Sequence, residues 1–194
     1  MGDTRRIHER AAENLVFIRD AMERAGSFTA VPGWGGVVMG LAGLAAAIIA
    51  PAQTTRTAWL VTWLAAAAVA SAAGILAVLL KSRQFDVPFL SRPARQFALS
   101  FSPAILAGAL LTAACYRSGS FELLPGLWLL LYGSAIVAGG TFSIRIVPLM
   151  GLVFLFLGAI ALFSSPVVAD ICLGAGFGGL HIVFGTIIAR NHGG

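Results

Sequence analysis

The sequence contains very little charge. Charged side chains make up 11% of its 194 residues, whereas an average soluble domain carries about 25%. A soluble protein of this size could not cover its surface with so few charged groups. Two cysteines are too few for a disulfide-rich scaffold, and a hydrophobic content of 58% is too high for a disordered chain. The composition therefore predicts an integral membrane protein.

Long apolar segments make up most of the chain. Six of them could cross about 30 Å of hydrocarbon as α-helices, because a helix rises about 1.5 Å per residue. None of them alternates over about ten residues as β-barrel strands do. We expect an all-α bundle of six transmembrane helices within a domain formed by residues 32–194, with the lipid bilayer as its surroundings. The expected spans are 32–50, 58–80, 97–116, 123–141, 146–164 and 166–189.

Aromatic residues lie near the predicted ends of these spans. They are Trp34, Trp59, Tyr116 and Trp128. Tryptophan and tyrosine are enriched at membrane–water interfaces, where an amphipathic ring contacts both headgroups and hydrocarbon. The sequence therefore predicts that these four side chains form interfacial belts.

The basic residues are distributed unevenly between the two sides that six spans define. Eleven of the 13 lie on the side of the N- and C-termini, and only Arg56 and Arg117 lie on the other. The positive-inside rule then predicts a prokaryotic inner-membrane protein with both termini in the cytoplasm. The net charge of +5 is thus a topological feature and does not indicate a nucleic acid partner.

The segment 1–31 is predicted to hold a cytoplasmic amphipathic helix and a connector. One apolar stripe recurs at helical spacing, and arginine, aspartate and glutamate occupy the opposite face. Three interpretations stay open: the stripe packs against the chain's own bundle, docks on a second copy or another protein, or senses lipid. The stripe consists of Ile7, Ala11, Leu15, Ile18 and Met22.

Glycines are concentrated in the spans. Gly36 with Gly40 and Gly174 with Gly178 form GxxxG pairs, which let two helix backbones approach closely. Such small-residue faces favour a homo-oligomer. The Pro-Gly-x6-Gly patterns at residues 32–40 and 125–133 are compatible with an inverted repeat of three helices, or with one packing face on each helix.

Two polar residues inside the spans are candidates for function. Asp170 is the only formally charged residue there, and His181 follows it by about three turns on the same predicted helix. An ionisable group in a membrane is a functional candidate by default, although Asp170 could instead pair with Arg56 or Arg117. The other histidines, His8 and His192, lie outside the spans, so the sequence predicts no haem, no other cofactor and no metal site.

No familiar catalytic motif is present, and we expect a protein that is not an enzyme. Cys115 and Cys172 both lie near the predicted outer face, where they could pair or remain free. Two functions stay open, and the scarcity of polar groups in the spans favours the first. The first is an accessory or regulatory membrane protein that acts through its N-terminal helix. The second is a transporter or channel for a small solute, an ion or protons, in which Asp170 and His181 line the route.

Overall fold

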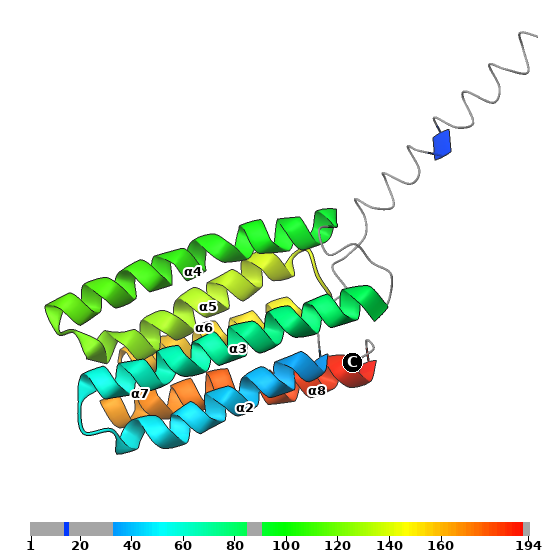
Figure 1. The fold of residues 1–194 in the computed structure, drawn as a ribbon. Helices are drawn as coiled ribbons and strands as arrows, with labels where there is room; N and C mark the ends of the chain where they lie inside the picture. Colours follow the sequence, from blue (N-terminus) through cyan, green and yellow to red (C-terminus); the bar gives the residue numbers. More distant parts are fainter. Residues whose placement is uncertain (1–13, 16–32, 85–90, 192–194) are drawn as a thin grey trace, which may run out of the picture.

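The computed structural model describes residues 14–15, 33–84 and 91–191, and these residues are almost entirely helical. Asn14 and Leu15 are helical, but the rest of the predicted N-terminal amphipathic helix lies outside the described residues. The helices follow one another along the chain without an intervening strand ladder in the described ranges (Figure 1). They are α2 (Gly33–Ile49), η1 (Ala50–Ala52), α3 (Arg56–Gln84), α4 (Arg92–Ser118), η2 (Phe121–Leu123), α5 (Leu124–Gly140), α6 (Ile146–Leu162), α7 (Pro166–Leu173), the π-helix η3 (Gly174–Leu180) and α8 (His181–Asn191).

Five helical segments in the described residues are long and apolar enough to cross a membrane. They are Gly33–Ala52, Arg56–Arg83, Arg92–Ser118, Phe121–Gly140 and Pro166–Asn191. The remaining apolar helix, α6, has 17 residues, which is at the lower limit for a span. The prediction of an all-helical fold is therefore confirmed, with five described segments that could cross a membrane, whereas the count of six spans stays a prediction.

Helices α3 and α4 extend beyond the spans predicted at 58–80 and 97–116. Helix α3 continues to Gln84, and α4 begins at Arg92, so the four basic residues between the two predicted spans lie in helical turns. The Ser91 hydroxyl accepts a hydrogen bond from the Ala94 backbone N–H at 3.4 Å, and Pro93 lies in the first turn. A serine cap followed by proline is a typical helix start, because both satisfy or remove unpaired N–H groups.

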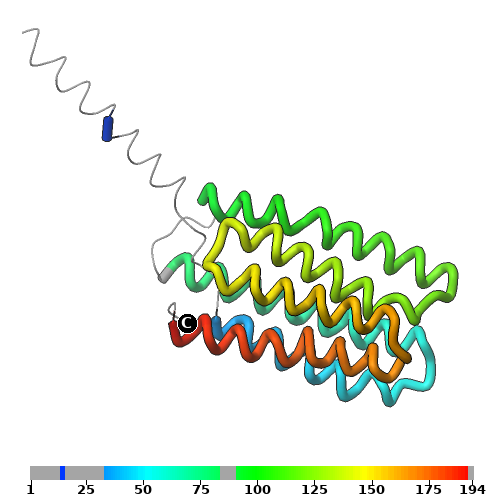
Figure 2. Tube along the Cα trace, turned by 180° about the vertical axis from the view of Figure 1, so that it is seen from behind, coloured from blue at the N-terminus to red at the C-terminus, as the bar shows by residue number. Residues whose placement is uncertain are grey.

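The helices pack in a definite order around the bundle. Helix α2 packs against α3 on one side and against η3 and α8 on the other, while α5 packs between α4 and α6. The segment α7–η3–α8 forms one long helix that closes the bundle between α2 and α6, as the view from behind shows (Figure 2). Helices α3 and α4 do not form a comparable packed pair.

Glycines allow the closest contact, which joins α2 to the long helix α7–η3–α8. A Cβ at Gly40 would lie 2.8 Å from the carbonyl oxygen of Gly178, and one at Gly36 would lie 3.2 Å from Cα of Gly185. A Cβ at Gly174 would lie 2.9 Å from the side chain of Ala47. The two GxxxG pairs seen in the sequence thus face each other across one interface.

The second glycine-rich contact joins α5 to α6. A Cβ at Gly133 would lie 2.8 Å from the carbonyl oxygen of Gly151, and one at Gly126 would lie 2.9 Å from Leu162. An inverted repeat would make α5 equivalent to α2, and α4 equivalent to the long helix α7–η3–α8. Because the glycine face of α2 contacts that long helix, the glycine face of α5 would have to contact α4. It contacts α6 instead, so the matching glycine patterns mark packing faces and give no support to a repeat.

Replacement of Gly40 by alanine is expected to destabilise the bundle by about 1–3 kcal/mol, because the added methyl group would overlap the backbone of the long helix. Gly179→Ala is the matched control, since a Cβ there would meet no atom within 4 Å. Both changes alter the backbone entropy of a glycine similarly. The free energy of unfolding in mixed micelles, followed by circular dichroism, measures the difference. Equal stability of the two variants would contradict the interface.

Candidate functional site

The long sixth apolar helix changes its hydrogen-bonding pattern at its centre. Residues Gly174–Leu180 form a π-helix between α7 and α8. This segment has the sequence GAGFGGL, so most of its positions carry no side chain that would resist the wider turn. A π-helical turn shifts the residues that follow it around the helix axis, and such turns occur frequently at functional sites. Here it determines the direction in which His181 projects.

His181 is the first residue of α8, and its side chain points into the bundle. The Nε2 atom lies 2.7 Å from the hydroxyl oxygen of Tyr132, which is the middle residue of α5. Only 5% of the His181 surface is exposed. The sequence analysis found His181 but missed Tyr132, so the structure supplies the partner of the only histidine in the predicted spans.

One nitrogen of this imidazole remains without a partner. The backbone carbonyls of Gly176 and Phe177 lie near the ring, but neither forms a well-aligned hydrogen bond with Nδ1 within the described part of the chain. If the Tyr132 hydroxyl donates to Nε2, Nδ1 carries the ring proton and lacks a well-aligned acceptor. If Nε2–H donates to the tyrosine oxygen, Nδ1 is an acceptor that lacks a donor. The pair therefore leaves one buried polar position open in either tautomer.

Aromatic rings surround the Tyr132–His181 pair. The ring of Phe154 lies 5.0 Å from that of Tyr132 and 5.5 Å from the imidazole, measured between centroids. Phe177 stacks on the imidazole at 6.2 Å with an interplanar angle of 16°, and Phe101 meets Tyr132 edge-on at 5.9 Å. These contacts exclude water, so an added charge or an unpaired polar atom at this position has a large energetic effect.

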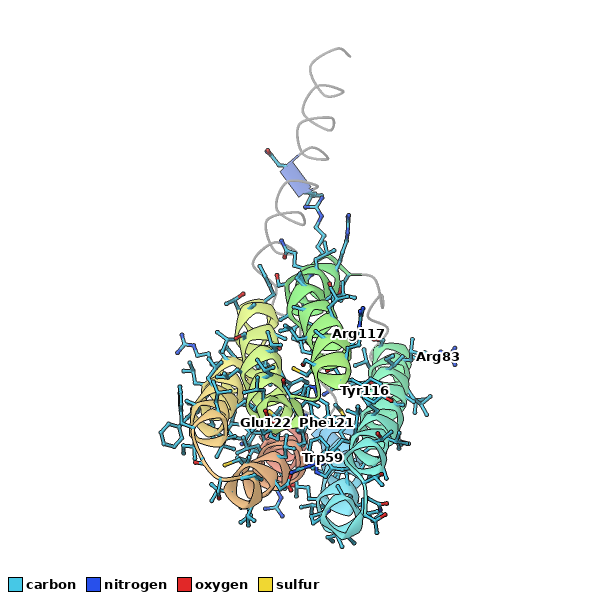
Figure 3. All side chains as sticks on the ribbon, turned by 90° about the vertical axis from the view of Figure 1, so that its left-hand side faces the viewer. Trp59, Arg83, Tyr116, Arg117, Phe121 and Glu122 are labelled. Atoms are coloured by element: carbon cyan, nitrogen blue, oxygen red, sulfur yellow. The ribbon has the colours of Figure 1, made fainter. Side chains whose placement is uncertain are left out.

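Asp170 has a different partner, near the opposite end of the same long helix. The indole Nε1–H of Trp59 donates to Oδ1 of Asp170 at 3.1 Å. The Trp59 ring stacks on Trp128 at 5.7 Å, and the Trp128 indole N–H donates to the Thr112 hydroxyl at 2.8 Å. Figure 3 views the bundle from this end and labels Trp59 there.

Asp170 and His181, the two polar residues predicted inside the spans, thus have different hydrogen-bond partners. Of the two arginines considered for Asp170, Arg56 interacts with it electrostatically. Arg117 shows no such interaction in the described ranges. The spacing from Asp170 to His181 does not correspond to three α-helical turns, because the π-helix intervenes. The two side chains bond to α3 and α5 respectively, and they do not contact each other as one polar pair.

Two of the four aromatic residues predicted near span ends make hydrogen bonds within the protein. Trp59 is only 7% exposed, and the half-buried Trp128 packs against it. Trp34 and Tyr116, by contrast, are 59% and 50% exposed. The indole N–H groups of Trp59 and Trp128 find acceptors in Asp170 and Thr112, whereas the interfacial position of all four rings stays a prediction.

The interior aromatic residues form one chain of contacts. Trp63 lies 6.5 Å from Trp59 and 6.3 Å from Phe177, which in turn stacks on His181. The residues of this chain come in pairs spaced by four along α3, α4, α5 and the long helix, so each pair shares one helix face. That spacing is visible in the sequence, but ordinary packing faces of apolar helices share it, so it does not by itself identify a site. The pairs are Trp59 with Trp63, Phe97 with Phe101, Trp128 with Tyr132, and Phe177 with His181.

The other candidate groups add no chemistry to this site. Cys115 and Cys172 are both buried and carry free thiols. No group of three metal-ligating side chains occurs among the described residues. Comparison of the chain with models of protein families, with curated proteins and with solved structures gave no match.

Removal of the Asp170 carboxylate is expected to destabilise the protein because it leaves the buried indole N–H of Trp59 without an acceptor. We expect Asp170→Ala to cost about 1–3 kcal/mol, and Asp170→Asn to cost less, since an amide oxygen still accepts. Equilibrium unfolding in mixed micelles measures both. In a Trp59→Phe background, the Asp170→Ala change should cost much less. A full additive loss in the double variant would show that the hydrogen bond contributes nothing.

Proposed function

We propose that this protein is a membrane transporter that moves protons, alone or with a small solute, and that the Tyr132–His181 pair carries the proton. The observation that supports the proposal is this buried pair beside a π-helical turn, at the middle of α5. Polar groups at such a depth are costly and mark ion or proton pathways in other membrane proteins. A π-helical turn inside a longer helix is also frequent at functional sites.

Imidazole is suited to this role because it can accept a proton on one nitrogen and release it from the other. In this site Nε2 faces the Tyr132 hydroxyl, and Nδ1 has no partner. A proton that binds Nδ1 lets Nε2 release its proton to the Tyr132 hydroxyl, which in turn passes its own proton to water admitted beside it. Asp170, which is partly exposed near the other end of the long helix, supplies a carboxylate where protons can enter.

The described conformation corresponds to a closed state in this proposal. The rings of Trp63 and Phe177 lie between the Asp170–Trp59 pair and the Tyr132–His181 pair. A proton can pass only when these rings move and admit water. Phe177 belongs to the glycine-rich π-helix, so a return of this segment to α-helical hydrogen bonding would rotate its ring.

The proposal predicts that His181→Gln and Tyr132→Phe each reduce proton flux by about tenfold or more, because each removes one proton-transferring group. The full chain is reconstituted into liposomes that contain a pH-sensitive dye, and flux is driven by a potassium gradient with valinomycin. Ser134→Ala is the matched control on α5, since its hydroxyl bonds only to the Leu130 carbonyl of its own helix. Wild-type flux equal to that of empty liposomes, or unchanged flux in both variants, would contradict the proposal.

We further propose that α6 is a sixth span and that both termini face the cytoplasm of a prokaryotic cell. The distribution of arginines supports this orientation: Arg83, Arg92 and Arg145 adjoin one set of helix ends, and Arg56 and Arg117 adjoin the other (Figure 1). The accessory role considered for the N-terminal helix depends on residues outside the described ranges.

The orientation predicts that a reporter fused after Gly194 is cytoplasmic, whereas the same reporter inserted after Gly119 is periplasmic. Gly119 is exposed, and its positive φ of 78° ends α4 in a turn that tolerates an insertion. Alkaline phosphatase activity, which requires export, measures the difference. Activity of the fusion after Gly194 would overturn the orientation.

A further inference from the structure

Two buried polar atoms in the aromatic chain have no hydrogen-bond partner within the described part of the chain. They are Nε1 of Trp63 and Nδ1 of His181. Each side chain is only 5% exposed. Unpaired buried donors are rare because they lose their hydration without compensation, and they commonly indicate a bound water, ion or ligand.

The two side chains that carry these atoms both pack against the ring of Phe177. The Phe177 ring lies 6.3 Å from Trp63 and 6.2 Å from His181, measured between centroids. Tyr132 lies 5.1 Å from Phe177 and completes the group. A ligand that satisfies both open atoms must therefore be flat enough to lie among these rings and must carry hydrogen-bond acceptors at separated positions.

The packing of the helices favours access from the bilayer. Trp63 projects from α3, and α3 and α4 do not form a packed pair. Both helices expose apolar side chains along their length, among them Leu64 at 47% and Leu106 at 64%. A molecule that enters between these helices comes from hydrocarbon, so the favoured ligand is lipophilic.

We propose that Trp63 and His181 are the two hydrogen-bonding ends of a site for a planar, lipophilic molecule with carbonyl oxygens. Trp63 Nε1–H donates to one oxygen and His181 Nδ1–H donates to another, while the Tyr132 hydroxyl donates to Nε2 and holds that tautomer. Phe177 moves aside, and the remaining rings stack on the ligand. This inference rests on the proposed function only through His181, and it names the class of molecule that the transporter would bind.

Binding of tritiated 2-methyl-1,4-naphthoquinone to the full chain in nanodiscs tests the site, with empty nanodiscs subtracted. We expect saturable binding that unlabelled quinone displaces and that 2-methylnaphthalene, which lacks the oxygens, does not. Trp63→Phe keeps an aromatic ring but removes the donor, so it should weaken binding about tenfold, equivalent to about 1.4 kcal/mol. Trp34→Phe, at an exposed tryptophan of α2, should leave the Kd unchanged.

Trp63→Phe is not expected to impair folding, because it removes a donor that has no partner. Its melting temperature is therefore measured beside the binding. Absence of saturable binding, equal displacement by 2-methylnaphthalene, or the same Kd in the Trp63 and Trp34 variants would overturn the site. Quinone binding without proton flux would contradict the proposed transport and support the ligand site. Proton flux without quinone binding would support transport and contradict the ligand site.

Discussion

The close approach of α2 to the long helix α7–η3–α8 is the constraint on which the rest of the structure depends. A Cβ at Gly43 would lie 2.5 Å from the carbonyl oxygen of Phe177, so the two backbones are almost in contact at the π-helix. This contact fixes the position of the wide turn against a rigid neighbour. The directions of Phe177 and His181 follow from it, and so does the hydrogen bond to Tyr132 on the far side of the bundle. The glycines therefore influence the site indirectly: they allow the backbone contact, and that contact determines where the side chains of Phe177 and His181 lie.

Most of the fold could be predicted from the sequence, because long apolar runs have few alternatives to membrane helices. The ends of α3 and α4 could not, since the predicted spans end where hydropathy falls, although the lysine and arginines beyond them are good helix formers. The cap formed by Ser91 was visible in the sequence. The change in hydropathy is a stronger signal than this cap. It predicts where a span leaves the hydrocarbon, however, and the helix can continue beyond that point.

The site could be predicted only in part. Asp170 and His181 stand out because polar residues are rare in the spans, but their partners are aromatic residues that an apolar bundle contains in number. Trp59 and Tyr132 become recognisable only when hydrogen bonds reach across α3 and α5. The π-helix was also not predicted. Its glycines indicated close packing, and close packing does not reveal whether the backbone keeps its α-helical pattern.

The shortness of α6 has a consequence for the surrounding lipid. Its 17 residues extend about 26 Å, which is less than a typical hydrocarbon thickness of about 30 Å. Phe156, at 65% exposure, and Leu152 face outward from this helix. In a protein that uses α6 as the proposed sixth span, the bilayer beside α6 would have to thin, while the 27-residue α4 on the other side of α5 would accommodate a thicker layer by tilting. Under that proposal the two sides of the bundle favour different hydrocarbon thicknesses, and the acyl-chain length of the lipid would act on the conformation of the protein.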